Sequence, residues 1–152
     1  MSNQSETNKQ HKPVTLNSLQ EMKRKGEKIV CLTVYDAGFA AILEHAGVDV
    51  FLVGDSLGMV IQGHDTTLPV TVNDMVYHTA SVRRGSPHAF IMTDMPFMSY
   101  PTVEQALKNA GRIMKKGGAQ MVKLEGGGAF VDRVEQMVSH AIPVCAHLGL
   151  MP

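Results

Sequence analysis

Acidic side chains and one histidine follow short apolar stretches of this sequence, always at the same end of the stretch. Val48–Val53 is rich in β-branched residues, stops at Gly54 and leads directly into Asp55 and Ser56. A short run that is apolar on both faces and ends in glycine is typical of a buried parallel strand. Other runs lead in the same way into Tyr35-Asp36, Asp94, Glu125 and His147. Because parallel strands present their carboxyl ends at one rim, where α/β folds bind ligands, we expect these side chains to share one site.

Three of these carboxylates have the chemistry of a metal site. Asp55 and Asp94 end neighbouring predicted strands, and Glu125 ends the next. Adjacent carboxylates repel each other and raise a pKa, and a divalent cation removes that cost; hard oxygen ligands with room for water suit Mg²⁺. Each aspartate alone is equally well explained as a turn residue that bonds its own backbone. The addition of Glu125 favours a metal site.

Other polar residues near the predicted rim each have a functional and a structural explanation. Lys123 shares a strand face with Glu125, so it either binds a substrate carboxylate or forms a structural ion pair with Glu125. Ser56 either donates to a substrate oxygen or caps its own turn. His147 has the chemistry of an acid, a base or a hydrogen-bond donor, although a lone histidine after a strand is more often structural. The run Gly126–Gly128 either approaches an anion with its amides or forms a flexible loop.

Composition narrows the class of protein. The chain has 152 residues, 44% of them hydrophobic, and a formal net charge of +0, which argues against a nucleic-acid binder. Cys31 and Cys145 lie in predicted buried strands and are expected to be reduced thiols.

No apolar run approaches the roughly 18 residues of a transmembrane helix. Residues 1–14 are predicted to be a flexible tail and resemble neither a secretory signal nor a transit peptide, so we expect a cytoplasmic protein without membrane contact.

Hydrophobic periodicity predicts alternating strands and helices after a first helix that a Ser18–Glu21 capping box begins and Gly26 ends. The predicted strands are 28–34, 48–53, 89–93, 120–124 and 142–146. The predicted helices are 18–25, a segment capped by Asp36 with a stripe of Phe39, Ile42, Leu43 and Ala46, a segment from Thr71 or Asn73 to Arg84, 103–116 and 129–141. Gly54 to Val72 is expected to be a long loop of the kind that is often functional.

Strict alternation of this kind predicts a parallel sheet, either doubly wound or closed into a (βα)8 barrel. No Gly-x-Gly-x-x-Gly motif follows the first strand, which weighs against a dinucleotide-binding sheet. Polar residues spread over several strand ends favour the barrel. A full barrel takes about 250 residues. We therefore expect residues 15–152 to form a partial (βα)8 TIM-barrel fold, an N-terminal helix plus about five βα units with the C-terminal units missing.

Several motifs in register closely resemble the ketopantoate (3-methyl-2-oxobutanoate) hydroxymethyltransferase family, from about Thr15 to the last residue. The motifs are Leu52–Gly58, Gln62–Thr71, Tyr77–Ala80, Val82–Gly85, Asp94–Met98, Met121–Gly127 and His147–Pro152. The resemblance implies a (βα)8 barrel related to phosphoenolpyruvate mutase and isocitrate lyase. It implies transfer of a hydroxymethyl group from 5,10-methylenetetrahydrofolate to 3-methyl-2-oxobutanoate, giving 2-dehydropantoate for pantothenate biosynthesis, through an enolate that Mg²⁺ stabilises.

By this resemblance, Asp55 and Asp94 ligate Mg²⁺ and Glu125 lies at or behind the metal. The 2-oxo acid is expected to contact Asp55, Ser56, Asp94 and Lys123, with His147 as a possible auxiliary group near the hydroxyl of the product. Folate is the second small-molecule partner, and family members form large homo-oligomers.

The family's general base is a glutamate of the sixth strand, which this sequence does not reach, so no residue here is assigned as the base. The alternatives are an inactive or partner-dependent fragment that binds metal and 2-oxo acid, which would need the rest of the barrel, and a related lyase or mutase.

Overall fold

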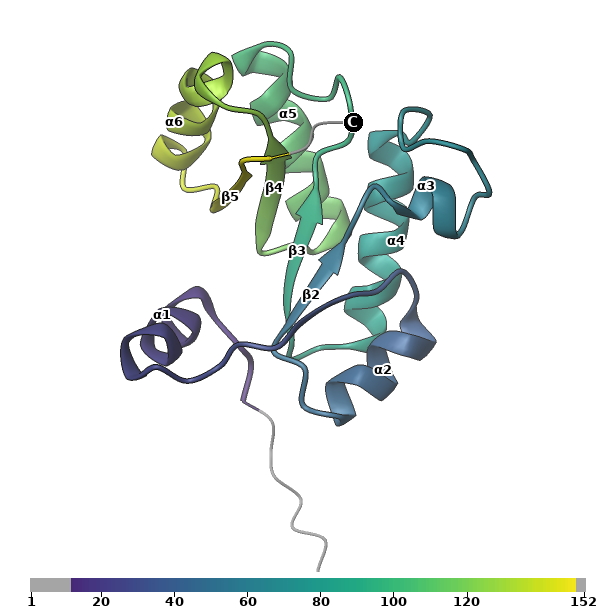
Figure 1. Ribbon diagram of the computed structural model, residues 1–152, viewed down its shortest axis with the longest axis vertical. Helices are drawn as coiled ribbons and strands as arrows, with labels where there is room; N and C mark the ends of the chain where they lie inside the picture. Colours follow the sequence, from purple (N-terminus) through teal and green to yellow (C-terminus); the bar gives the residue numbers. More distant parts are fainter. Residues whose placement is uncertain (1–11, 150–152) are drawn as a thin grey trace, which may run out of the picture.

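The computed structural model describes residues 12–149 as a parallel five-stranded sheet with helices alongside it (Figure 1). The strands are β1 (Cys31–Thr33), β2 (Val50–Val53), β3 (Phe90–Asp94), β4 (Met121–Glu125) and β5 (Val144–His147). Each strand pairs in parallel with the next along the chain, so the sheet order is β1-β2-β3-β4-β5. This order is that of a (βα)8 barrel, whereas a doubly wound sheet reverses its order partway. The predicted barrel-type arrangement is therefore confirmed over these units.

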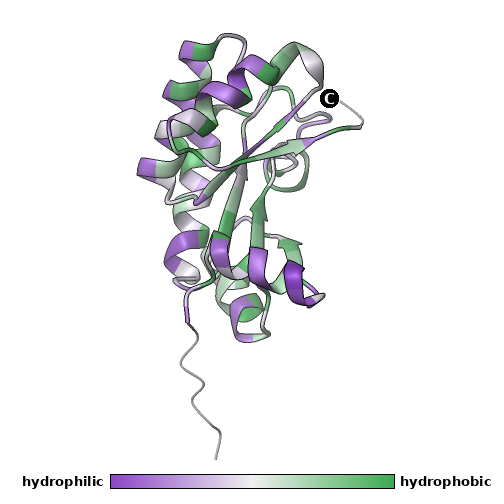
Figure 2. Cartoon of the chain, turned by 90° about the vertical axis from the view of Figure 1, so that its left-hand side faces the viewer, coloured by the Kyte–Doolittle hydropathy of each residue, from purple (hydrophilic) through white to green (hydrophobic). Residues whose placement is uncertain are grey.

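One helix precedes β1, and the other helices lie between successive strands. The helices are α1 (Leu16–Lys25), α2 (Ala37–His45), α3 (Leu57–Val60), α4 (Val72–Gly85), α5 (Val103–Arg112) and α6 (Val131–Ser139), with a π-helical turn η1 (Ile113–Gly117) after α5 and a 3-10 turn η2 (Gly128–Phe130) before α6. Figure 1 shows α4 and α5 running beside the strands, while α1 stands apart near the amino ends of the strands. In Figure 2 the strands are mainly apolar and the helices carry most of the hydrophilic colour.

The two faces of the sheet differ in burial. Phe51, Ile91 and Val122 are fully buried and pack into cores that include helical residues such as Met75 and Ala110. Their neighbours Leu52, Met92 and Met121 are registered with one another and are only partly buried. Because successive strand residues point to opposite faces, the helices cover one face and the other is open. In a barrel, this second face lines the interior.

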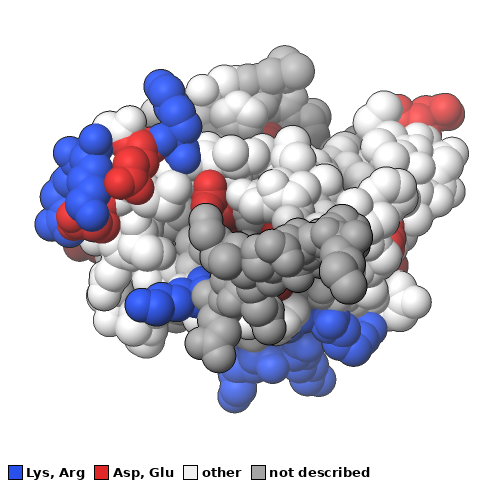
Figure 3. Space-filling view, turned by 90° about the horizontal axis from the view of Figure 1, so that it is seen from below, with Lys and Arg blue, Asp and Glu red and all other residues white. Residues whose placement is uncertain are grey.

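The first helix starts earlier than predicted. Its N-cap is Thr15, whose hydroxyl accepts from the backbone N–H of Ser18 (3.1 Å), while the Ser18 hydroxyl accepts from the backbone N–H of Thr15 (2.8 Å). Ser18 is thus the last residue of the capping box, at position N3, instead of its first, because serine can fill either role. Gly26 ends the helix in the left-handed conformation, as expected. Charges of both signs gather over this helix (Figure 3), where Glu21 forms ion pairs with Arg24 and Lys25.

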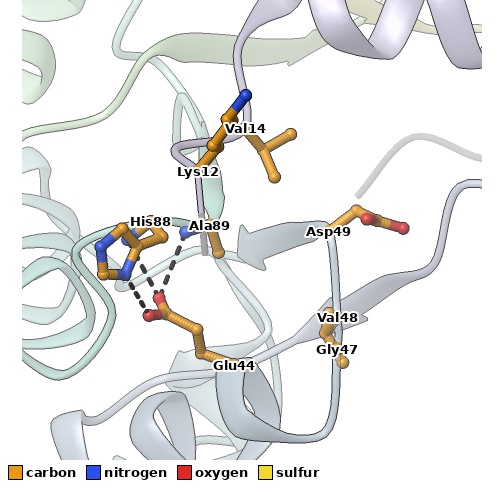
Figure 4. Close-up of a pocket in the computed structure, with 8 residues that line it drawn as sticks. All are labelled: Lys12, Val14, Glu44, Gly47, Val48, Asp49, His88 and Ala89. Carbon is orange, nitrogen blue, oxygen red and sulfur yellow. Dashed lines mark hydrogen bonds and ion pairs between the residues drawn. The ribbon is translucent and has the colours of Figure 1, made fainter. Parts of the chain in front are cut away.

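The apolar stripe predicted for α2 faces the core only in part: Leu43 packs against the core, but its neighbours in the stripe do not. Phe39 and Ile42 are 64% and 66% exposed, whereas Ala40 is fully buried. Two contacts explain this rotation of the helix. A Cβ on Gly85 would lie 2.2 Å from the carbonyl oxygen of Ala37, so α2 and α4 approach each other very closely there. Glu44, on the same side of α2 as Ala40, reaches across to the start of β3 (Figure 4).

The carboxylate of Glu44 accepts hydrogen bonds from four donors. They are the backbone N–H groups of His88 (3.1 Å) and Ala89 (3.2 Å), Nδ1 of His88 (2.8 Å) and the hydroxyl of Ser86. Burial alone would raise the pKa of Glu44, but these hydrogen bonds stabilise the ionised form and hold the pKa below its ordinary value. The interaction fixes the end of α2 against β3.

A small pocket of about 60 Å³ lies beside Glu44 at the amino ends of the strands (Figure 4). Val14, at the end of the predicted tail, lines this pocket and donates its backbone N–H to the carbonyl of His88 (2.7 Å). Residues 1–11 of that tail lie outside the described residues. The pocket contains none of the predicted site residues, which lie at the opposite ends of the strands.

Two further predictions about local structure are wrong. The segment 54–72 is not one long loop, because Leu57–Val60 forms the short helix α3, with Leu57 buried. Cys31 is exposed although it lies in a strand, because β1 is at the edge of the sheet and its inward side is open; Cys31 and Cys145 are both free thiols. No helix within residues 12–149 has the length and apolar character needed to cross a membrane.

Replacing Glu44 by glutamine should lower the free energy of unfolding by about 2 kcal/mol at pH 7, because an amide cannot accept from all four donors. The native pKa of Glu44 lies below its ordinary value of 4.5, so this stabilisation is complete above pH 4.5 and is lost as pH falls through the native pKa. Denaturant titrations from pH 3 to 8 measure the difference between the two proteins. In the Glu21→Gln control, whose ion pairs with Arg24 and Lys25 lie at the surface, stability should change by less than about 0.5 kcal/mol. A Glu44→Gln difference that is equally large at pH 3 would contradict this explanation.

Candidate active site

The predicted polar residues lie at the carboxyl ends of neighbouring strands. Asp94, Glu125 and His147 are the last residues of β3, β4 and β5, so each of these strands runs one residue further than predicted. Asp55 and Ser56 follow β2 and precede α3. Lys123 is registered with Asp94, and Glu125 with His147, so each pair lies on the same face of the sheet. That face is the open one.

The ammonium group of Lys123 lies between two carboxylates. Its Nζ is 2.8 Å from Oδ1 of Asp94 and 3.6 Å from Oε1 of Glu125. Burial alone would lower the pKa of Lys123, but the hydrogen bond to Asp94 and the charges of Asp94, Glu125 and Asp55 raise it above its ordinary value. Lys123 is therefore protonated at neutral pH. The ion pair with Glu125 that the sequence left open is present, together with a shorter one to Asp94.

The aspartates carry the excess negative charge of the site. The backbone N–H of Asp55 donates to Oδ2 of Asp94 (3.2 Å), which brings the two residues together. Burial, together with the charges of Asp94 and Glu125, raises the pKa of Asp55 to about 6, and Lys123 offsets only part of this effect. Burial also raises the pKa of Asp94, against the opposing effect of Lys123. Three carboxylates with one ammonium group leave a net negative site that a cation would stabilise.

These residues fit a divalent cation better as a pair of ligands than as a triad. Within the described residues, no three His, Cys, Asp or Glu side chains converge closely enough to hold a metal ion. Mg²⁺ commonly uses one or two protein carboxylates and completes its shell with water and substrate oxygens. A Cβ on Gly54 would lie 2.7 Å from Oγ of Ser56 and 3.5 Å from Oδ2 of Asp94, so glycine keeps open the space between these two oxygens. Asp55 and Asp94 are thus the residues that could hold Mg²⁺ directly.

Glu125 is held by its neighbours. Its Oε1 contacts Nδ1 of His147 (2.9 Å) as well as Lys123, and the hydroxyl of Tyr100 bonds both the carbonyl (3.2 Å) and the N–H (3.4 Å) of its backbone. The ring of Tyr100 packs edge-on against Phe130. These contacts favour a place for Glu125 behind the metal, because its carboxylate is already occupied.

Tyr35, which the sequence places at the end of the first predicted strand with the other rim residues, bonds Oγ of Ser56 through its hydroxyl (2.8 Å), while Asp36 caps α2. Two residues that the sequence did not place at the rim, His78 and Tyr100, contact Tyr35 and Glu125. His78 bonds the carbonyl of Tyr35 through Nδ1 (2.8 Å), and Tyr100 holds Glu125. Tyr35 directly follows a predicted strand region, which is a usable signal. His78 lies in the middle of α4 and Tyr100 lies in a loop. Nothing in their sequence spacing indicated these contacts.

Comparisons with known proteins identify the family of this chain. A family model described as ketopantoate hydroxymethyltransferase matches residues 13–152. The chain belongs to the ketopantoate hydroxymethyltransferase family. It is 64% identical over 139 residues to the 3-methyl-2-oxobutanoate hydroxymethyltransferase of Nitrosococcus oceani, covering 91% of this chain and 53% of the relative. It is 60% identical over 139 residues to that of Halorhodospira halophila, covering 91% and 50%. The chain thus spans about half the length of these hydroxymethyltransferases.

Solved structures support the barrel-type fold. The chain matches 2,3-dimethylmalate lyase, a member of the PEP mutase/isocitrate lyase superfamily, with a TM-score of 0.66 and 18% identity over 86% of this chain and 50% of the lyase. It matches oxaloacetate acetylhydrolase, solved with its product oxalate, with a TM-score of 0.65 and 12% identity over 89% and 53% of the chains. At such identities, the likeness to lyases shows a shared fold alone, whereas the hydroxymethyltransferase relatives share the sequence.

Replacing Asp55 by asparagine should stabilise the metal-free protein at pH 8. The raised pKa of Asp55 means that its contribution to stability is complete below its ordinary value of 3.8 and is lost as pH rises through about 6, while asparagine stays neutral. Melting temperatures in a chelator from pH 4 to 8 should therefore diverge, with the variant higher above pH 6. Added Mg²⁺ should raise the melting temperature of the original protein only. The exposed Asp65→Asn control should behave like the original, and parallel pH curves for Asp55→Asn would contradict the assigned cause.

Proposed function

We propose that this chain carries the metal-binding and 2-oxo-acid-binding part of a hydroxymethyltransferase active site. The reaction is the transfer of a hydroxymethyl group to 3-methyl-2-oxobutanoate, giving 2-dehydropantoate for pantothenate biosynthesis. The carbon of this group comes from 5,10-methylenetetrahydrofolate, water supplies its oxygen, and tetrahydrofolate is released. The observation that carries the proposal is the group formed by Asp55, Asp94, Lys123 and Glu125 at the strand ends of a chain that belongs to this family.

Lys123 provides the positive charge for an anionic substrate. Its ammonium group has three donors, and in the absence of substrate it contacts Asp94 and Glu125. A substrate carboxylate that reaches Lys123 finds a cation already desolvated and oriented, so little side-chain entropy is lost on binding. The hydroxyl of Ser56 lies beside the same space, because a Cβ added to Gly54 would be 2.7 Å from Oγ of Ser56.

Asp55 and Asp94 would hold Mg²⁺. When bound, the ion supplies positive charge that stabilises the negative charge developing on the 2-oxo oxygen as C3 loses its proton, giving an enolate that attacks the one-carbon unit. The C3 hydrogen is weakly acidic, so a positioned base is also required. Glu125 is engaged by Lys123 and His147, which leaves it unsuited to that role. The base is then the glutamate of the family's sixth strand. His147 has an auxiliary role near the product hydroxyl.

The test is exchange of the C3 proton of 3-methyl-2-oxobutanoate for deuterium, followed by NMR with Mg²⁺ and without folate. Two proteins are compared: the 152-residue chain, and a chimera in which it replaces the matched half of the Nitrosococcus oceani relative. The chimera should catalyse Mg²⁺-dependent exchange, and Asp55→Ala should slow this by about a hundredfold or more, as expected for loss of the group that holds the charge-stabilising ion. The exposed Asp65→Ala control should stay within about twofold of the unmodified chimera.

The 152-residue chain should bind Mg²⁺ and the 2-oxo acid in calorimetry and exchange the proton slowly or not at all. Exchange by this chain alone would place a base among the residues described here. A folded chimera without exchange would overturn the proposed function and favour a fragment that binds without catalysis. Dependence of product formation on 5,10-methylenetetrahydrofolate separates the transferase from a lyase or mutase. Folate binding, homo-oligomer formation and a cytoplasmic location stay predictions.

A further inference from the structure

We propose that Tyr35 is a positioning residue that sets the hydrogen-bond direction of Ser56, so that Ser56 donates to the 2-oxo acid. The inference rests on the proposed function, because it concerns how that substrate is held. It starts from one contact, the 2.8 Å hydrogen bond between the hydroxyls of Tyr35 and Ser56, which bridges the carboxyl ends of β1 and β2.

The chemistry of the substrate makes the direction of this bond important. The oxygens of a 2-oxo acid anion are all hydrogen-bond acceptors, so a protein group that binds them must donate. Ser56 has one hydroxyl proton. If Ser56 gives that proton to Tyr35, it meets the anion with lone pairs only. If Tyr35 donates to Ser56, the proton of Ser56 is free for the substrate.

The structure leaves the Ser56 hydroxyl available for this role. Ser56 occupies the N-cap position of α3, but its side chain makes no capping hydrogen bond. The alternative that Ser56 simply caps its own turn is therefore wrong. Its hydroxyl is instead turned to Tyr35, in a partly buried setting next to the space kept open by Gly54.

Tyr35 is the better donor of the two. A phenol donates a stronger hydrogen bond than an aliphatic hydroxyl, and successive bonds in one direction polarise each other in a site of low dielectric. The expected chain therefore runs from the Tyr35 O–H to Oγ of Ser56, and from the Ser56 O–H to the substrate. The ring of Tyr35 packs against the core, so the phenol cannot easily turn away.

The backbone around Tyr35 is fixed on both sides. Val34 donates its N–H to the carbonyl of Leu52 (3.0 Å), and Asp36 caps α2 by accepting from the N–H of Phe39 (2.9 Å). The carbonyl of Tyr35 itself bonds Nδ1 of His78 (2.8 Å). A carbonyl only accepts, so Nδ1 of His78 carries the proton. His78 thus holds the backbone of Tyr35 from α4.

The test is a double-mutant cycle on binding of 3-methyl-2-oxobutanoate, measured by calorimetry with Mg²⁺ on the 152-residue chain. Ser56→Ala should raise the dissociation constant about tenfold, which corresponds to about 1.4 kcal/mol. Tyr35→Phe keeps the ring in the core and should cause a similar rise. The double variant should bind no more weakly than Ser56→Ala, because Tyr35 acts through Ser56. Tyr77→Phe, an exposed tyrosine on α4, is the matched control and should leave binding unchanged.

A second pair of variants tests whether the hydrogen bond from His78 holds Tyr35 in place. Asparagine can place its Nδ2 where histidine has Nδ1, so His78→Asn should bind the 2-oxo acid like the original chain, whereas His78→Ala should raise the dissociation constant several-fold. In the chimeric enzyme, Tyr35→Phe should raise KM with little change in kcat, as expected when a contact to the ground-state substrate and to the transition state is lost equally.

The outcomes separate the two proposals. If the original chain and the chimera both fail to bind the 2-oxo acid, the proposed function falls and this inference with it. If the original chain binds and Tyr35→Phe binds equally well, Tyr35 has no positioning role. If the effects of Tyr35→Phe and Ser56→Ala add in the double variant, Tyr35 acts independently of Ser56, and the inference is overturned while the proposed function stands.

Discussion

The ammonium group of Lys123 among three carboxylates is the interaction on which the rest of the site depends. Without it, the like charges of Asp94, which is buried, and Glu125, which is partly buried, would lie at the ends of β3 and β4 with no cation between them, and this would destabilise the fold. The site is still incompletely neutralised, as the raised pKa of Asp55 indicates. The incomplete neutralisation lowers the stability of the chain at this position, a pattern that is common at functional sites.

Much of the fold was predictable because short β-branched runs alternate with amphipathic helices. Parallel pairing followed from that alternation, and it was enough to place Asp55, Asp94, Glu125 and His147 at one rim. The proximity of Lys123 to Glu125 followed from their spacing of two in one strand. These inferences held because they rest on the period of two along a strand and on the common direction of parallel strands, which tertiary packing does not change.

Other features depended on contacts between segments far apart in the sequence. The orientation of α2 is set by the hydrogen bond of Glu44 to Ala89 and by the missing Cβ of Gly85. The periodicity of α2 alone therefore wrongly placed Phe39 and Ile42 toward the core. Capping patterns near Ser18 were ambiguous by one turn. The contact between Tyr35 and Ser56 joins residues 21 positions apart, and neither residue type has a preferred partner that a pattern could identify.

The order of the strands has a consequence for how such a chain is made. Each strand from β2 to β5 pairs with the strand synthesised just before it, so its partner strand is already present when it leaves the ribosome. The sheet can therefore grow from its amino-terminal end with mostly local loop closures, which favours rapid formation. In a closed barrel of this type, the one distant pairing is the seam between the first strand and the last. The barrel then closes late, and until it closes β1 is an unpaired edge strand.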